Sequence, residues 1–127
     1  MFVTTDRLIR LVSGTVPNEG RVEVRTGCYS EWGTVCDDLW GTADAQVACR
    51  QLGYATDGVI AYSSARFGQG TGDILLDNLG CTGSEASLVE CPHNGIGIDD
   101  CSHFEDAGVF CPTCKQITVI YSHIRTV

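Results

Sequence analysis

The stretch "WGTVCDDLWG" at residues 32–41 places two adjacent carboxylates, Asp37 and Asp38, directly after a cysteine and between two tryptophans. Adjacent acids repel each other, so bulk water, a basic partner or a metal ion must offset the cost. Trp32 and Trp40 are large and mainly apolar, and we expect them in the core rather than in a ligand platform. The stretch therefore joins a core segment to concentrated negative charge.

The cysteine in this stretch is one of eight in a chain of 127 residues. These cysteines are scattered, at positions 28, 36, 49, 81, 91, 101, 111 and 114. In a chain of single-domain length this distribution indicates a disulfide framework, and so an oxidising, extracellular compartment. A zinc protein would usually show paired C-x-x-C knuckles, and only "CPTC" at 111–114 has that form.

The net charge of −8, from sixteen acidic and eight basic residues, favours cations or basic protein surfaces as partners. It speaks against nucleic acid, which requires a basic face, and against attachment to an anionic membrane. No apolar run is long enough to span a bilayer, and the first ten residues do not have the pattern of a signal peptide. We therefore expect a piece of a longer extracellular chain, either secreted or a receptor ectodomain.

Hydrophobic periodicity predicts several short strands and one clear helix. In the strand "RVEVRT" (21–26), Val22 and Val24 face one way while Arg21, Glu23 and Arg25 face the other. The helix "TADAQVACRQLG" (42–53) places Cys49 on its apolar stripe, so its disulfide is directed inward. The further predicted elements are strands at 7–12, 31–36, 59–63, 74–79 and 107–111, and a short second helix at 84–91.

Several segments together resemble the scavenger receptor cysteine-rich domains. They are "IRLVSG", "GRVEV", "WGTVCDD", "ACRQLGY", "ARFGQGTGDILLDNLGC", "SLVECPHNG" and "CSHFEDAGVFC", in family order. The resemblance covers residues 7–112, which leaves 1–6 as a lead and 113–127 as an appendage or linker. It implies an α+β fold, in which a curved, mostly antiparallel sheet cradles one main helix plus a short second helix.

The resemblance also implies three disulfides: Cys36–Cys101, Cys49–Cys111 and Cys81–Cys91. The chain departs from the family at Asp73, where proline is usual, and resembles the six-cysteine group because Tyr54 rather than cysteine follows "RQLG". The two remaining cysteines match no usual position. We expect Cys28 to pair with Cys114 and to hold the appendage on the sheet, with an intermolecular bridge as the alternative.

The implied Cys36–Cys101 bridge brings Asp37 and Asp38 close to Asp99 and Asp100, with Glu105 nearby. Crowded carboxylates favour a cation, and calcium suits oxygen ligands in flexible number, with magnesium as the alternative. The resemblance implies that Asp37, Asp38 and Glu85 form the cation site. A second candidate site comprises Asp44, Asp77 and Asn78. The alternative for all of them is ordinary solvated surface charge.

Two further groups of residues are candidates for ligand binding or catalysis. Arg21, Arg25 and Arg66 form a candidate anion patch, against the alternative of solvated charge. We expect His103 to be a structural hydrogen-bonding residue, His93 to lie in a turn and His123 in the appendage. Nucleophile-elbow, zincin and phosphate-loop motifs are absent from the sequence, so we expect no catalytic activity.

The expected function is a non-catalytic extracellular recognition module. Its cation-supported acidic surface would bind a protein, or a polyanionic or microbial surface ligand. The alternative is an accessory domain of a secreted enzyme, such as a protease or an amine oxidase.

Overall fold

The computed structural model describes residues 8–113 and contains one six-stranded sheet, one helix and two 3₁₀ turns. The strands are β1 (Ile9–Ser13), β2 (Glu19–Val24), β3 (Gly33–Val35), β4 (Ile60–Tyr62), β5 (Ile74–Leu76) and β6 (Gly108–Phe110). The helix α1 spans Thr42–Gln51, and the 3₁₀ turns are η1 (Leu88–Glu90) and η2 (His103–Glu105). The predicted α+β class, strands and main helix are confirmed. The second helix is only the single turn η1, and η2 was not predicted.

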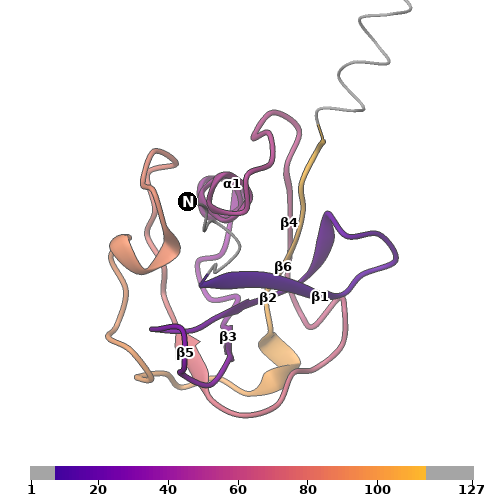
Figure 1. Ribbon diagram of the computed structural model, residues 1–127. Coiled ribbons are helices and arrows are strands. Elements are labelled where there is room, and N and C mark those ends of the chain that lie inside the picture. Colours follow the sequence, from indigo (N-terminus) through magenta and orange to yellow (C-terminus); the bar gives the residue numbers. More distant parts are fainter. Residues whose placement is uncertain (1–7, 114–127) are drawn as a thin grey trace, which may run out of the picture.

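Strand β2 is central to the sheet, since it pairs with β1, β3 and β6. The order of the sheet is β4-β6-β2-β3-β5, and β1 pairs with β2 outside this path. All pairings are antiparallel except that of β3 with β5, which is parallel and carries a register shift between Thr34 and Val35. The last strand, β6, therefore lies inside the sheet, between β4 and β2 (Figure 1).

The helix α1 begins at a polar cap and presents an apolar stripe to the sheet. The Asp44 carboxylate accepts a hydrogen bond from the Gly41 backbone N–H at 2.9 Å, which satisfies one of the donors left open at a helix start. Ala45, Ala48 and Cys49 are fully buried against Val22 and Val24 of β2 and their neighbours. This apolar core occupies the side of the sheet on which α1 lies.

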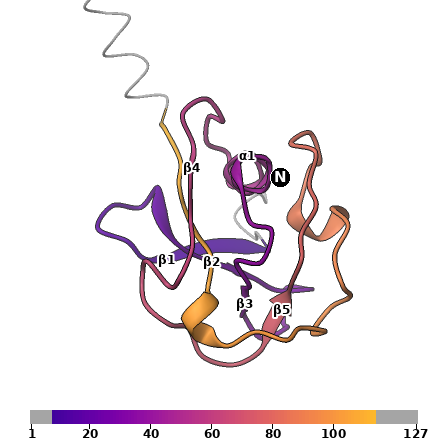
Figure 2. The ribbon, with the colours of Figure 1, turned by 180° about the vertical axis from the view of Figure 1, so that it is seen from behind.

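The opposite side of the sheet is covered by the segment between β4 and β5 and by η2 (Figure 2). Titratable side chains pack here, and we call them the polar layer: Arg21, Glu23 and Asp106, which are buried, and His103, which is partly exposed. Arg21 donates to Glu23 at 3.0 Å and to the carbonyl of Gly68 at 3.2 Å, and Asp106 accepts from the Gly70 N–H at 2.7 Å. Gly70 has no room for a side chain, since an added Cβ would lie 2.6 Å from Thr34.

The structure contains the three disulfides that the family resemblance implies. Cys36–Cys101 and Cys49–Cys111 close segments of 65 and 62 residues, and Cys81–Cys91 closes one of 10. Cys28 is exposed just beyond β2. Cys114 and His123 lie outside the described residues, as do nearly all of the lead and the appendage, so the Cys28–Cys114 bridge stays a prediction.

Candidate functional site

Asp77 lies beside the "CDD" segment because β3 and β5 are parallel. The Cys36 N–H donates to the carbonyl of Leu76 at 2.9 Å, so the residues that follow the two strands leave the sheet side by side. Since parallel strands end at the same edge of a sheet, Asp77 is carried to Asp37 and Asp38. A parallel pairing of these two strands was not predicted, and Asp77 was consequently assigned to a different site.

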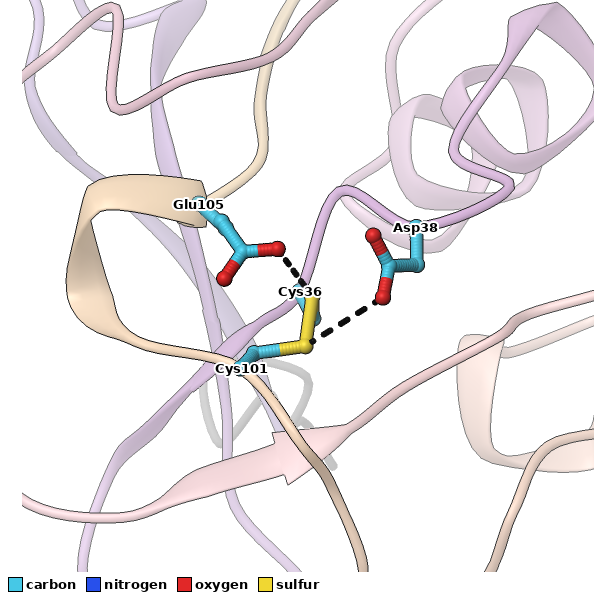
Figure 3. A group of neighbouring side chains, drawn as sticks. All are labelled: Cys36, Asp38, Cys101 and Glu105. Carbon is cyan, nitrogen blue, oxygen red and sulfur yellow. Dashed lines mark hydrogen bonds between the residues drawn. A yellow bond between two sulfur atoms is a disulfide. The ribbon is translucent and has the colours of Figure 1, made fainter.

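The Cys36–Cys101 disulfide brings a third segment, which carries Asp100 and Glu105, to the same place. The Asp37 N–H donates to the carbonyl of Glu105 at 2.8 Å, which fixes η2 against the "CDD" segment. The Asp38 and Glu105 carboxylates lie on either side of the disulfide, 3.6 Å and 3.9 Å from its sulfur atoms (Figure 3). A disulfide sulfur has no proton to donate, so these are close contacts rather than hydrogen bonds.

We call Asp38, Asp77, Asp100 and Glu105 the acidic cluster. Carboxylate oxygens of Asp38, Asp77 and Asp100 lie within 4.8 Å of one another, and an oxygen of Asp38 is as close to one of Glu105. Burial raises the pKa of Asp38, and the charges of Asp77, Glu105, Asp100 and Asp37 raise it further. Three segments far apart in the sequence, around Asp38, around Asp77 and at residues 100–105, thus concentrate negative charge at one point.

Asp77 is the buried member of the cluster. Its residue exposure is 0%, and burial raises the pKa of its carboxyl, to which the nearby Asp100 charge adds. The Oδ2 atom accepts from the Asn94 side-chain amide at 3.2 Å, whereas Oδ1 has no hydrogen-bond partner among the described residues. A buried carboxylate oxygen without a partner is costly, and a bound cation would remove that cost.

The predicted trio of Asp37, Asp38 and Glu85 is not brought together. Among the described residues, the Glu85 carboxylate lies in a group with the disulfide cysteines Cys81 and Cys91, and not with the acidic cluster. Its carboxylate accepts hydrogen bonds from the Thr82 and Gly83 amides, and the Thr82 bond is the main cause of its lowered pKa. Asp37 stays next to the cluster and accepts from the Ser64 N–H at 2.7 Å. Glu105 takes the place beside Asp38 that the sequence analysis gave to Glu85.

The predicted second trio is also divided. Asp44 is buried at the start of α1, where it accepts from the Gly41 and Cys81 amides, and burial raises its pKa. Asp77 belongs to the acidic cluster, and Asn78 adopts a left-handed backbone with φ of 56° directly after it. Asp44 therefore has a structural role: it caps the start of α1 and fixes the Cys81 backbone to it by a hydrogen bond.

The three candidate anion-patch arginines lie in different surroundings. Arg21 is only 8% exposed and belongs to the polar layer, so it is not solvated charge. Arg66 stacks on Tyr62 and Phe67, while Arg25 stacks on Trp32 with its Cζ 4.4 Å from the ring centroid. Arg10, which the sequence analysis did not select, stacks on the same ring at 4.3 Å.

The histidines of the described part have structural surroundings. Both nitrogens of His103 are engaged, Nδ1 with the Asp106 carboxylate at 2.9 Å and Nε2 with the Gly72 carbonyl at 2.9 Å. Although burial opposes protonation, these two contacts raise the pKa of His103. His93 accepts from the Gly95 N–H in the loop after Cys91.

Trp40, which was expected in the core, donates to the Gly108 carbonyl and packs against the apolar core.

The chain belongs to the scavenger receptor cysteine-rich family, whose model matches residues 12–112. It is 52% identical over 103 residues to a scavenger receptor cysteine-rich domain superfamily protein of Patiria pectinifera, covering 81% of this chain and 9% of that protein. It is 50% identical over 114 residues to lysyl oxidase homolog 2A of Danio rerio, covering 85% of this chain and 15% of that protein. The chain thus spans less than a sixth of either relative.

Among solved structures, the third domain of this family in murine neurotrypsin matches with a TM-score of 0.73. The identity is 50%, and the match covers 81% of this chain and 94% of that one. Domains of this family are typically extracellular, non-catalytic ligand-binding modules. Within residues 8–113, no helix has the length and apolar character needed to cross a membrane.

Proposed function

We propose that this domain is an extracellular recognition module whose acidic cluster holds a divalent cation and binds its ligand there. The proposal rests on Asp77, a fully buried carboxylate whose Oδ1 has no partner among the described residues and whose neighbours are other carboxylates. Folding this group into a negative surface is costly unless a cation accompanies it.

Calcium is the cation that fits this donor set best, with magnesium as the alternative. Asp38, Asp77, Asp100 and Glu105 offer only hard carboxylate oxygens, which calcium accepts in flexible number and geometry. The disulfide sulfurs beside them are not ligands, because a thiolate is needed to bind a metal. A cation held here would keep coordination positions open on its solvent side.

Ligand binding at such a site has a simple chemistry. Carboxylate oxygens that the cation fixes in place accept a Lys or Arg side chain from a protein ligand. A polyanionic or microbial surface ligand would instead place its own oxygens in the open coordination positions. Binding that is equal in calcium and in chelator would refute both forms of the proposal.

Calcium is expected to raise the melting temperature of the domain by a few degrees. Extracellular modules bind calcium with Kd of about 10⁻⁴ to 10⁻³ M. At millimolar calcium this corresponds to roughly 0.4 to 1.4 kcal/mol of added stability. Asp38→Asn should abolish the shift while leaving the calcium-free domain equally or slightly more stable, because it relieves repulsion. Thermal unfolding in calcium and in chelator measures both.

Glu85→Gln is the matched control for this experiment. Glu85 is a carboxylate in the same domain, but it lies outside the acidic cluster, so its substitution should leave the calcium shift unchanged. A shift that disappears with Glu85→Gln as well as with Asp38→Asn would instead support the site of Asp37, Asp38 and Glu85 that the family resemblance implies.

An alternative proposal is that the domain targets a larger secreted enzyme, such as a protease or an amine oxidase, to its substrate. The similarity to a lysyl oxidase homolog, of which the chain spans 15%, supports it. The cation site would then serve in docking to the substrate rather than in receptor binding. Sequencing the parent transcript, and assaying the parent protein with and without this domain, distinguishes the two.

A further inference from the structure

Among the described residues, the large apolar side chains that are most exposed after Tyr29 all lie close in sequence to members of the acidic cluster. Leu39 is 73% exposed, Phe104 70% and Ile98 61%. Leu39 follows Asp38, Phe104 precedes Glu105, and Ile98 lies two residues before Asp100. Single exposed apolar residues are ordinary on protein surfaces. Here, however, all three lie on the two segments that supply the exposed part of the cluster: Leu39 beside Asp38, and Ile98 and Phe104 on the segment that carries Asp100 and Glu105.

Covalent geometry limits the distance between the backbones of Leu39 and Phe104. The backbones of Asp37 and Glu105 are directly hydrogen-bonded. Leu39 is two residues from the first and Phe104 one residue from the second, so their Cα atoms lie at most roughly 17 Å apart. A standard interface of about 800 Å² per partner is roughly 30 Å across, so both residues fit within one contact area.

The backbone of Leu39 adds a second observation. Its φ is 66°, a left-handed conformation that costs a branched apolar residue free energy. Asparagine or glycine would occupy this position with less strain, and neither would place an apolar side chain in water. The turn at Leu39, closed by the hydrogen bond from the Trp40 N–H to the Asp37 carbonyl, explains the backbone conformation, but it does not require an exposed apolar side chain at this position.

Taking the cation-supported cluster of the proposed function as given, we propose that Leu39 and Phe104, with Ile98, form an apolar rim that selects the partner. The partner is a protein segment in which a Lys or Arg is flanked by apolar or aromatic side chains. The basic group of the partner contacts the carboxylates, because its positive charge complements their negative charge. The apolar side chains on either side of it bury the rim. Apolar and aromatic anchors around a charged contact are typical of protein interfaces.

The proposal is tested with two synthetic peptides of equal charge, one alternating Arg with Leu and Phe, the other alternating Arg with Gly. In millimolar calcium the first should bind the full chain roughly tenfold more tightly, which is about 1.4 kcal/mol. The double variant Leu39→Asn, Phe104→Ser should bind the two peptides equally. Both residues are exposed and asparagine accepts the left-handed backbone, so the fold is retained.

Val16→Ser is the matched control, because Val16 is an exposed apolar residue in the turn between β1 and β2. It should leave the difference between the peptides intact. If wild-type chain binds both peptides equally but only with calcium, or if the difference survives in the double variant, the apolar rim is refuted and the proposed function stands. If neither peptide shows calcium-dependent binding, the proposed function fails and this inference fails with it.

Discussion

Replacing Cys49 and Cys111 with alanine is expected to lower the free energy of unfolding by about 4 kcal/mol. The disulfide closes a segment of 62 residues, and the chain-entropy model values such a loop at about that figure. For a domain of this size the loss corresponds to a melting temperature roughly 15 °C lower. Both cysteines are fully buried between α1 and the end of β6, so the lost packing adds to the effect. Urea unfolding of the double variant measures it.

The Cys81–Cys91 pair provides the comparison. It closes only 10 residues, for which the same model gives about 3 kcal/mol. Removing this bridge should therefore destabilise the domain less than removing Cys49–Cys111. An equal or larger loss would mean that native-state contacts, rather than the entropy of the unfolded chain, account for the stabilisation.

Asp106→Ala should destabilise the domain by about 3 kcal/mol. Asp106 is buried in the polar layer, where it accepts from Gly70 and pairs with His103. Removing one partner of a buried ion pair leaves the other uncompensated, at a cost of about 3–5 kcal/mol. His103 is partly exposed, which places the expected loss at the lower end. Asp99→Ala, at an exposed position in the loop before Cys101, should change stability little and serves as the control.

The same pair makes stability fall as the pH rises above 6.5. The pKa of His103 is raised above its ordinary value of 6.5, so the folded state holds its proton more tightly than the unfolded state. Its contribution is complete below pH 6.5 and is lost as pH rises through the folded pKa. Urea unfolding at a series of pH values should show this decline, and His103→Gln should remove it. Identical slopes in the two proteins would contradict the assignment.

The sequence was sufficient for the elements that depend on local pattern. The alternation of Val22 and Val24 in β2, and the stripe of Ala45, Ala48 and Cys49 in α1, predicted the faces that form the apolar core. The alternation of apolar and polar residues in β2 did not predict that the polar face of the strand is also buried. Arg21 and Glu23 looked like solvated charge, because the segment that covers them lies more than forty residues later in the chain.

The candidate site was predicted in part, for a related reason. The adjacency of Asp37 and Asp38, and the approach of Asp100 across the Cys36–Cys101 bridge, followed from the sequence and the family resemblance. The place of Asp77 depends on the parallel pairing of β3 with β5, which no local pattern encodes. The resemblance implied Glu85, whose carboxylate accepts from the Thr82 and Gly83 amides of its own loop, whereas Glu105 lies close to Asp38. The role of Glu85 as a cation ligand stays a prediction.

The position of β6 has a consequence for how this domain is made. A strand that is synthesised last but lies between β4 and β2 leaves the sheet incomplete until it arrives. At 5–20 residues per second, Cys49 is synthesised roughly 3 to 12 s before its partner Cys111. During that interval the Cys49 thiol can form non-native disulfides with other cysteines. Cys81 and Cys91, only 10 residues apart, are both available soon after synthesis. Oxidative folding of the nascent chain should therefore depend on disulfide isomerases that hold Cys36 and Cys49 until the last strand is translocated.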